Sequence, residues 1–199
     1  YKDMQIGGAG RDENNNVAWL TTNGGEAEIS GIELNMEAAV GENWFFDATL
    51  GTIDFQFTDL AFSDPATRIE LGLDPGAATD INSVPGRTPE LTWSIGAGYN
   101  TLLPNGSSLR LRYGVSWQDE TFFGENNDPL TVSPSYSLSN ARITWVSPEE
   151  DWEASLFMTN IADKRAIQSR LNFRDLFGSI QTTYVRPQEW GLTVKKLFF

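Results

Sequence analysis

Arginine and phenylalanine side chains gather near the C-terminal end of the chain, where they could bind a ligand. The segment from 164 to 184 contains Arg165, Arg170, Phe173, Arg174 and Phe177. Guanidinium groups make charge-assisted hydrogen bonds to anions, and aromatic rings offer stacking surfaces. These residue types favour contact with an anionic, aromatic small molecule. The segment could instead form a short amphipathic helix, or simply rest over an internal opening of the fold.

A second segment, from about 58 to 87, is rich in carboxylates. Its acidic residues include Asp59, Asp64, Glu70, Asp74 and Asp80. Carboxylate oxygens are hard ligands that suit Ca²⁺, but the spacing of an EF-hand is absent. We therefore interpret this segment as a solvated acidic loop and predict no metal site.

The composition argues against most enzymatic chemistry. The 199 residues include no His and no Cys, which removes the usual general base, thiolate nucleophiles and the commonest ligands of zinc. No spacing singles out a pair of acids for glycoside hydrolysis, and "GGAG" precedes no strand-to-helix pattern that would bind phosphate. A net charge of -13 disfavours nucleic-acid binding. We predict no enzymatic activity and no cofactor.

The elements that must position any site are strands, because apolar residues recur at every second position. In the stretch from 91 to 99, Leu91, Trp93 and Ile95 share one face while Thr92 and Ser94 share the other. The pattern predicts strands near 25–40, 43–57, 88–102, 107–121, 135–147, 151–162 and 184–198, and a stub of another in 1–8. After Gly51 the apolar phase slips, which indicates a bulge or a change of environment. The predicted fold class is all-β, an antiparallel up-and-down meander.

Connections alternate in length. The turns at 41–43, 103–107 and 148–151 are tight, whereas the loops at about 9–24, 58–87, 122–134 and 163–183 are long. Every long loop therefore lies at one end of the sheet, as in outer-membrane barrels, whose strands also end in aromatic girdles. Beside the tight turns stand Trp44, Trp145 and Trp152, and we place Tyr99, Trp117 and Trp190 towards the other strand ends.

This pattern predicts a transmembrane β-barrel in which apolar side chains meet lipid and polar ones line a lumen. The residues expected to face lipid are Leu91, Trp93, Ile95, Leu111, Tyr113, Val115, Trp190, Leu192, Val194 and Phe198. Those expected in the lumen are Glu33, Glu37, Arg110, Arg112 and Arg142. Pairing with lumen carboxylates such as Glu33 and Glu37 is the favoured role of the arginines, and contact with a substrate or another domain is the alternative. Lys196 breaks the sorting, but a long ammonium stem can snorkel to the interface.

Four segments together resemble the C-terminal barrel of TonB-dependent outer-membrane receptors. The first is "GGEAEISGIELNMEAAV", with Gly31, Ile32 and Glu33, and the second is "RTPELTWSIGAGY", whose strand begins after Pro89. The third is "WEASLFMTNIADK", which has the family's Asn160, Asp163 and Lys164 but carries Ile161 where the family has Leu. The fourth is the closing "RPQEWGLTVKKLFF". Phe198 stands where the alternating phase of such a closing strand ends, and Phe199 is left over.

The resemblance implies a barrel of about 22 strands around an N-terminal plug, of which residues 1–199 are the C-terminal portion without the plug or the first strands. It implies a receptor in the outer membrane of a Gram-negative bacterium that binds a scarce nutrient, such as a ferric siderophore, and imports it with energy supplied by TonB through the plug. It also implies outer-membrane lipid and the outer-membrane insertion machinery, acting on the C-terminal strand, as partners.

Two other functions stay open from the residues alone. One is a small passive or structural outer-membrane barrel closed by about eight strands. The other is a soluble β-sandwich that binds carbohydrate through exposed Trp. An upstream reading frame with a plug pattern would favour the receptor, and solubility without detergent would favour the sandwich. An isolated wall segment would expose two unpaired edges, which we expect to be covered by another part of the receptor or by another chain.

Overall fold

The computed structural model describes residues 1–11, 17–60, 66, 69, 81–124, 127–173 and 178–198; side chains are described outside 6–11, 17–24 and 173. Its main feature is an eight-stranded antiparallel sheet in the order β1-β2-β3-β4-β5-β8-β9-β12. The strands are β1 (Met4–Arg11), β2 (Val17–Val40), β3 (Trp44–Leu60), β4 (Leu91–Leu102), β5 (Ser108–Gln118), β8 (Tyr136–Val146), β9 (Trp152–Thr159) and β12 (Glu189–Lys196). The predicted all-β meander and its strands are confirmed.

Three segments expected to be loops are partly strands. Residues 163–183 contain the hairpin of β10 (Ile167–Phe173) and β11 (Ser179–Tyr184), so the expected loop or helix there is wrong. In the same way β2 starts at Val17, inside the loop expected at 9–24, and pairs with β1 from there. The 122–134 loop carries β6 (Thr121–Phe122), the 3-10 helix η2 (Pro129–Thr131) and β7 (Val132–Ser133). β6 and β7 have two residues each, which is too few to show a period-two pattern.

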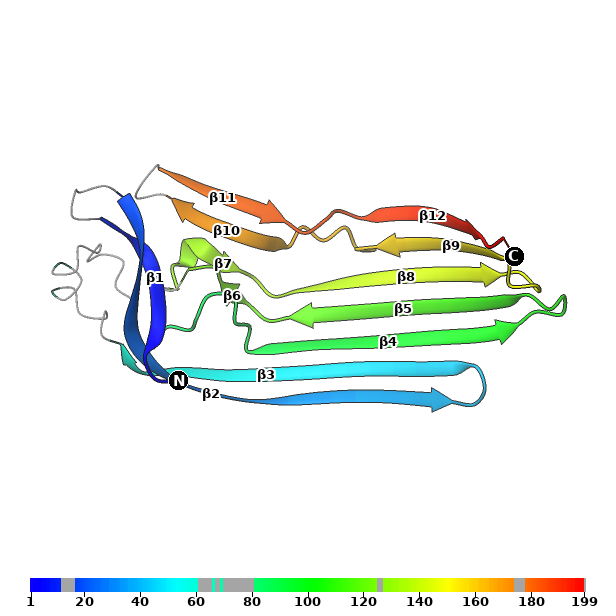
Figure 1. Cartoon of the computed structure of the whole chain (residues 1–199), viewed down its shortest axis with the longest axis horizontal. Coiled ribbons are helices and arrows are strands. Elements are labelled where there is room, and N and C mark those ends of the chain that lie inside the picture. Colours follow the sequence, from blue (N-terminus) through cyan, green and yellow to red (C-terminus); the bar gives the residue numbers. More distant parts are fainter. Residues whose placement is uncertain are drawn as a thin grey trace.

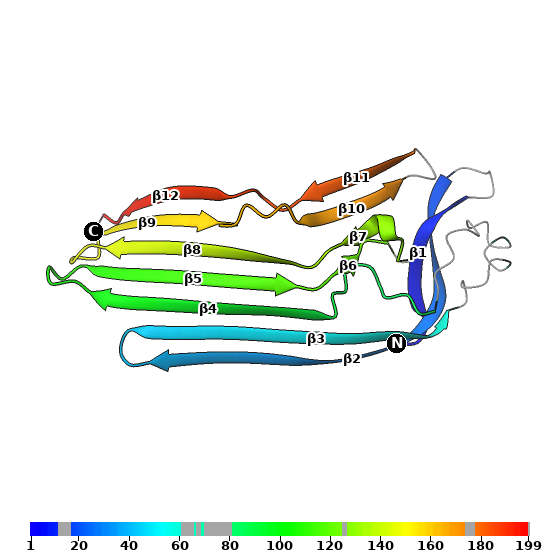
Figure 2. The ribbon, with the colours of Figure 1, turned by 180° about the vertical axis from the view of Figure 1, so that it is seen from behind.

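The two ends of the sheet differ as the connection lengths predict. Figure 1 shows the tight turns and the C-terminus at one end, here called the turn end. The opposite loop end carries β6, β7, β10 and β11, with β1 lying across it, and Figure 2 shows the same arrangement from behind. Any site built from the long connections therefore lies at the loop end.

The sheet has an apolar face and a polar face, which alternate along each strand. The apolar face includes Ile95, Tyr113 and Leu192, which are 53%, 49% and 67% exposed. The polar face includes Ser94 and Arg112, each next in sequence to a residue of the apolar face. No second sheet packs on the apolar face among the described residues. The sandwich alternative is therefore not supported, because a sandwich buries that face.

The phase slip after Gly51 is a change of environment and not a bulge. The pairing of β2 with β3 runs without a break from Ala27↔Phe57 to Val40↔Trp44. Above Thr52, towards the loop end, Ile53 and Phe55 therefore lie on the polar face, while Asp54 lies on the apolar one. The apolar band of β2 spans Ile32 to Val40, close to the nine to eleven residues that cross a bilayer as a strand.

Aromatic residues mark both limits of this band. At the turn end Trp44 packs on Tyr99, with ring centroids 4.8 Å apart. Towards the loop end Trp93 stacks on Trp117 at 6.2 Å. The placement of Tyr99 at the loop end was wrong, because β4 runs from the loop end to the turn end and residue 99 lies near its finish.

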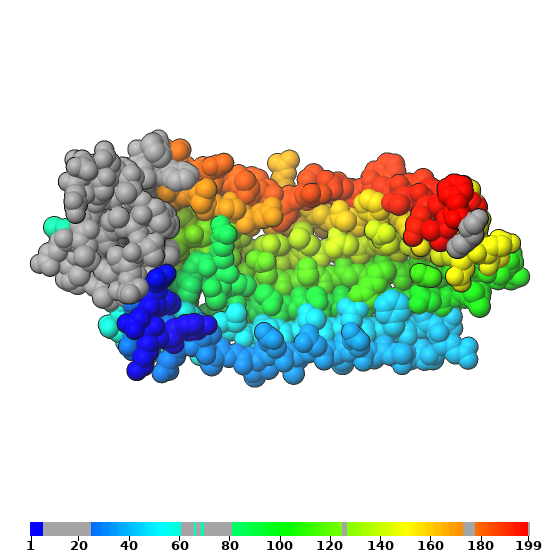
Figure 3. All heavy atoms as spheres, viewed as in Figure 1, coloured from blue at the N-terminus to red at the C-terminus, as the bar shows by residue number. Residues whose placement is uncertain are grey.

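Both long edges of the sheet are open. Beyond Ala27, β2 pairs only with β3, and β12 pairs only with β9 among the described residues. Figure 3 shows β2 (blue) along one long edge and β12 (red) along the other. A small closed barrel would join these edges, so that alternative is not supported. No helix among the described residues is long and apolar enough to cross a membrane.

Candidate functional site

One row of residues crosses the polar face of six neighbouring strands. Cross-strand pairing places Phe45, Gly98, Arg112, Arg142, Phe157 and Gly191 side by side, from β3 to β12. Two arginines therefore lie directly opposite each other at the centre of the row. Like charges in such positions repel, so their surroundings must compensate.

Arg112 is held by an anion and a ring. It forms an ion pair with Asp47, and its guanidinium carbon lies 5.3 Å from the ring centroid of Phe45. The ring of Phe45 occupies the space where a side chain at position 98 would stand, so only Gly98 leaves room for it. The predicted pairing of this arginine with a carboxylate of the same face holds, but the partner is Asp47 and not Glu33 or Glu37.

Arg142 repeats the ring contact without the anion. Its guanidinium carbon lies 5.3 Å from the ring centroid of Phe157, which in turn packs over Gly191. Neither Arg142 nor Arg110 forms an ion pair with any described residue. Both are exposed on the polar face, as are Glu33 and Glu37 on β2.

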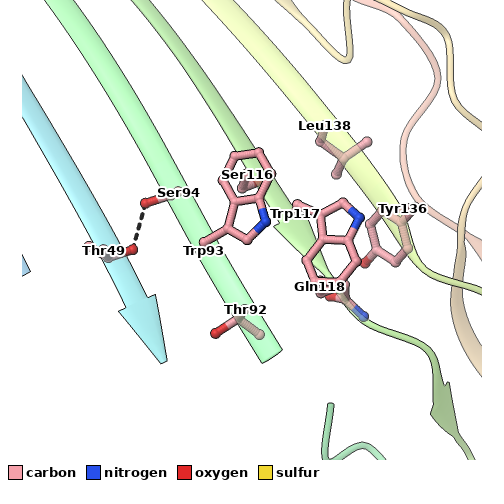
Figure 4. Close-up of a pocket in the computed structure, with 9 residues that line it drawn as sticks. All are labelled: Thr49, Thr92, Trp93, Ser94, Ser116, Trp117, Gln118, Tyr136 and Leu138. Carbon is pink, nitrogen blue, oxygen red and sulfur yellow. Dashed lines mark hydrogen bonds between the residues drawn. The ribbon is translucent and has the colours of Figure 1, made fainter. Parts of the chain in front are cut away.

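A shallow groove of about 370 Å³ runs beside this row (Figure 4). Its polar-face lining consists of Thr49, Thr92, Ser94, Ser116, Gln118, Tyr136 and Leu138. Trp93 and Trp117 also border the groove, although alternation assigns their side chains to the apolar face. Thr49 and Ser94 share a hydrogen bond of 2.7 Å between their hydroxyl groups. Hydroxyl and amide groups therefore dominate this surface.

At the loop end, hydrogen bonds from Arg170 link the β10–β11 hairpin to the connection that contains η2 and β7. Its Nη1 donates to the carbonyl oxygens of Leu130 at 2.8 Å and Val132 at 3.2 Å, and its Nε donates to Thr182 at 3.2 Å. Asn172 adds a bond to Asp128, at 2.9 Å. The β10–β11 hairpin is thus tied to η2 and β7, which makes Arg170 a positioning residue.

The other four residues of the predicted ligand segment lie just before β10, at its end, or beyond it. Arg165 is exposed just before β10. Phe173 ends β10, and its side chain lies outside the described set, as do Arg174 and Phe177 entirely. The described residues therefore do not test whether the five lie together, and their binding role stays a prediction.

Asn160 has a structural role for which the sequence supplied only a motif match. It is 5% exposed and has a φ of 48°. Its side chain donates to the carbonyl oxygens of Lys164 and Arg186, at 3.0 and 2.9 Å, and accepts from the amide of Lys164. Asp163 accepts from the amide of Gln188 at 2.9 Å. This motif joins the end of β9 to the approaches of β10 and β12.

Comparison with known protein families identifies one match. Residues 1–161 match the family model described as TonB dependent receptor-like, beta-barrel. No curated protein matches the chain by sequence.

Solved structures share the fold at low identity. The ferric yersiniabactin uptake receptor FyuA from Yersinia pestis aligns with a TM-score of 0.73 and 17% identity, over 100% of this chain and 26% of its own. The siderophore receptor PiuA from Acinetobacter baumannii aligns with a TM-score of 0.66 and 18% identity, over 96% and 25%. BauA, the ferric preacinetobactin receptor of the same organism, aligns at 0.63 and 15%, over 96% and 26%. The chain therefore spans about a quarter of the length of the receptors that it matches.

Proposed function

The chain belongs to the TonB-dependent receptor β-barrel family, and on that premise we propose that residues 1–199 form the C-terminal wall of an outer-membrane import receptor. In this proposal a plug domain and the N-terminal strands complete the barrel. The segment itself supplies wall and loops, and performs no catalysis. The whole receptor binds a scarce nutrient on the extracellular side and imports it.

The observation that carries the proposal is an extended apolar face that no described residue covers. In water such a face costs about 25 cal/mol per Å² of exposed apolar area, whereas hydrocarbon removes that cost. The side chains proposed to meet lipid are Leu91, Trp93, Ile95, Leu111, Tyr113, Val115, Trp190, Leu192, Val194 and Phe198. On the opposite face Glu33, Glu37, Arg110, Arg112 and Arg142 line a water-filled lumen.

Lys196 supports this assignment of the two faces. It lies in register with Trp152 on the apolar face, yet its ammonium group reaches Asp151 in the tight turn. The Nζ atom lies 4.7 Å from the ring centroid of Trp152. A cation that turns away from the band towards the turn is what snorkelling to a membrane interface requires.

The nutrient is an anionic chelate of the ferric siderophore type. The three solved structures compared above are by name a ferric yersiniabactin uptake receptor, a siderophore receptor and a ferric preacinetobactin receptor. The Arg and Phe content of the β10–β11 region suits an anionic chelate of this kind. In this proposal Arg165, Phe173, Arg174 and Phe177 contact the ligand, and Arg170 holds their hairpin in place. TonB acts through the plug, and the insertion machinery recognises the C-terminal strand, β12.

Uptake by the full-length receptor tests the proposal. Cells that depend on it for iron are supplied with a panel of radiolabelled ferric siderophores, with and without TonB. We expect uptake of one class that requires TonB. Changing Arg165 and Arg174 together to Ala should reduce ligand binding by about tenfold or more, while Arg165→Lys retains most of it. TonB-independent uptake, or a receptor found in the soluble fraction, would overturn the proposal.

A further inference from the structure

A cation and an anion lie side by side where the apolar face meets the turn end. Lys196 is the only Lys or Arg on the apolar face among the described residues of the eight-stranded sheet. Its ammonium group pairs with Asp151 of the adjoining turn and lies over the ring of Trp152. The side chains of Lys196 and Asp151 are 28% and 24% exposed, so both charges can reach a ligand.

The turn holds the carboxylate of Asp151 in a defined position. Ser147 donates from its Oγ to Oδ1 of Asp151 at 2.8 Å, and Lys196 donates from its Nζ to Oδ2. Ser147 is buried and its Oγ accepts from the amide of Trp152 at 3.0 Å. The amide of Leu197 donates to the carbonyl oxygen of Asp151 at 2.8 Å, which joins the end of β12 to the turn. The two opposite charges are therefore presented by an ordered frame.

Both charged groups keep hydrogen-bonding capacity. An ammonium group has three N–H donors, and Lys196 makes one hydrogen bond with the described residues. A carboxylate has about four acceptor positions, and Ser147 and Lys196 occupy two of those on Asp151. A ligand that carries both an acidic oxygen and N–H donors would satisfy the two groups together.

Exposed apolar side chains continue from this pair along the same face. Leu192 and Val194 of β12 and Leu156 of β9 are exposed, and Leu192 lies in register with Leu156. Trp152 lies at their turn-end limit, in register with Lys196, and indole rings favour the membrane interface. A charged pair at the interface beside side chains that face hydrocarbon matches a molecule with a charged headgroup and acyl chains.

The charge of the turn selects among such molecules. Glu149 and Glu150 are exposed next to Asp151, so three carboxylates surround the single ammonium group of Lys196. A headgroup with a net negative charge is repelled by this turn. A headgroup with a phosphate and an ammonium group is neutral overall and offers N–H donors to Asp151. A choline headgroup is neutral as well, but its quaternary nitrogen has no N–H group.

We propose that Lys196 and Asp151 form a binding site for a phospholipid of the ethanolamine class. The lipid phosphate pairs with Lys196, its ammonium group pairs with Asp151, and its acyl chains lie along Leu192 and Val194. In the proposed barrel the tight turns face the periplasm, so the lipid belongs to the periplasmic leaflet. The inference rests on the proposed function only in placing the apolar face in a membrane.

Native mass spectrometry of the full-length receptor tests the site. The receptor is reconstituted in bilayers that contain equal amounts of phosphatidylethanolamine, phosphatidylcholine and phosphatidylglycerol, and the lipids that remain bound after extraction in mild detergent are counted. Lys196→Gln should weaken the binding of one phosphatidylethanolamine per receptor by about tenfold, because a charge-assisted bond is lost. Lys195→Gln removes the neighbouring cation on the polar face and should match wild type. Equal retention in wild type and Lys196→Gln would overturn the inference.

A change of headgroup preference tests the role of the turn. Glu149→Gln combined with Glu150→Gln should raise the retention of phosphatidylglycerol by about threefold or more, because repulsion is removed. Both side chains are exposed, so this variant tests the site even if Lys196→Gln lowers stability. Inorganic phosphate added during extraction should not release the phosphatidylethanolamine, since the site also binds the ammonium group. A wild-type preference for phosphatidylglycerol, an unchanged preference in the double variant, or release by phosphate would contradict the assignment.

The result separates this inference from the proposed function. A receptor that retains no lipid of any class has not entered the bilayer, which would overturn both. Retention of lipids without a preference among headgroups would overturn the phospholipid site alone, because the apolar face would still meet lipid.

Discussion

At the scale of single residues, the contacts that order the loop end are made by small polar side chains. The side chain of Asn160 forms hydrogen bonds with three backbone groups of two later segments. Its left-handed φ turns the chain out of β9. The motif that contains it was visible in the sequence because of a family resemblance. Its role was not, because the groups that it binds lie 4 and 26 residues away.

Replacing Asn160 by Ala should lower the free energy of unfolding by about 2–4 kcal/mol. Three part-buried hydrogen bonds to the backbone of Lys164 and Arg186 are lost, at about 0.5–1.5 kcal/mol each, and Ala tolerates a positive φ poorly. Thermal unfolding of the detergent-solubilised receptor measures the effect. Asn160→Gly accepts the same φ, so it isolates the hydrogen-bond loss. Wild-type stability in both variants would refute the role assigned to this side chain.

Asp151 predicts a dependence of stability on pH at the turn end. Hydrogen bonds from Lys196 and then from Ser147 lower the pKa of Asp151. A lowered folded-state pKa means that the contribution is present above the unfolded value of about 3.9 and is lost as pH falls through the folded value. The melting temperature of Asp151→Asn should therefore lie below that of wild type at pH 7, and the two should converge as the pH falls below the unfolded value of about 3.9. A constant difference over this range would contradict the assignment.

At the scale of elements, the fit between strands rests on particular glycines. A Cβ at position 98 would overlap the ring of Phe45, whereas the nearest atom to a Cβ at position 114 is 3.9 Å away. Gly98→Ala should therefore cost about 1–3 kcal/mol, and Gly114→Ala should be close to neutral. Both positions lie on the polar face of neighbouring strands, so the pair is matched. Equal melting temperatures for the two variants would show that the ring of Phe45 does not need Gly98.

At the loop end, Arg170 contributes two of the hydrogen bonds that hold the β10–β11 hairpin against η2 and β7. Arg170→Ala should loosen this attachment, because both bonds are lost together with the bond to Thr182 inside the hairpin. Amide hydrogen exchange of residues 167–173 should rise by about tenfold or more, with the exchange of β4 and β5 unchanged. Arg165→Ala, which removes an exposed side chain, provides the control. Unchanged amide exchange of residues 167–173 in Arg170→Ala would show that Arg170 does not position the hairpin.

Strands β4 and β5 were predictable, whereas the β10–β11 hairpin was missed. Residues 91–99 and 109–117 sort every second side chain, so β4 and β5 could be located from periodicity. The sequence "IQSRLNF" of β10 also alternates, with Ile167, Leu171 and Phe173 at every second or fourth position, but its arginine and phenylalanine content was interpreted as a ligand-binding loop. The partner of Arg112 was missed for another reason: cross-strand register, which brings Asp47 close, depends on turn geometry that residue types do not specify.

At the scale of the whole molecule, the open edges and the exposed apolar face have one explanation. A membrane-embedded barrel pairs both edges and covers the apolar face with lipid, whereas a soluble sheet would aggregate through them. The wall is also uneven in height, because β2 and β3 continue beyond Ile32 and Thr52 with their polarity reversed. In the proposed barrel, this reversal marks where the strands leave the membrane on the loop side.

Ile95 and Ser94 are neighbours in sequence on opposite faces of β4, so comparing them tests most directly whether the apolar face meets lipid. The 199 residues contain no Cys, so single cysteines at Ile95 and Ser94 can each carry a nitroxide label in the full-length receptor, once any Cys elsewhere in it is replaced. Paramagnetic relaxation measures how often each label collides with oxygen, which partitions into lipid, and with a nickel chelate, which stays in water. The account predicts that the label at 95 collides mainly with oxygen and that the label at 94 does not. A label at 95 that is shielded from oxygen and nickel alike would place the apolar face in a dry protein interior and contradict the account.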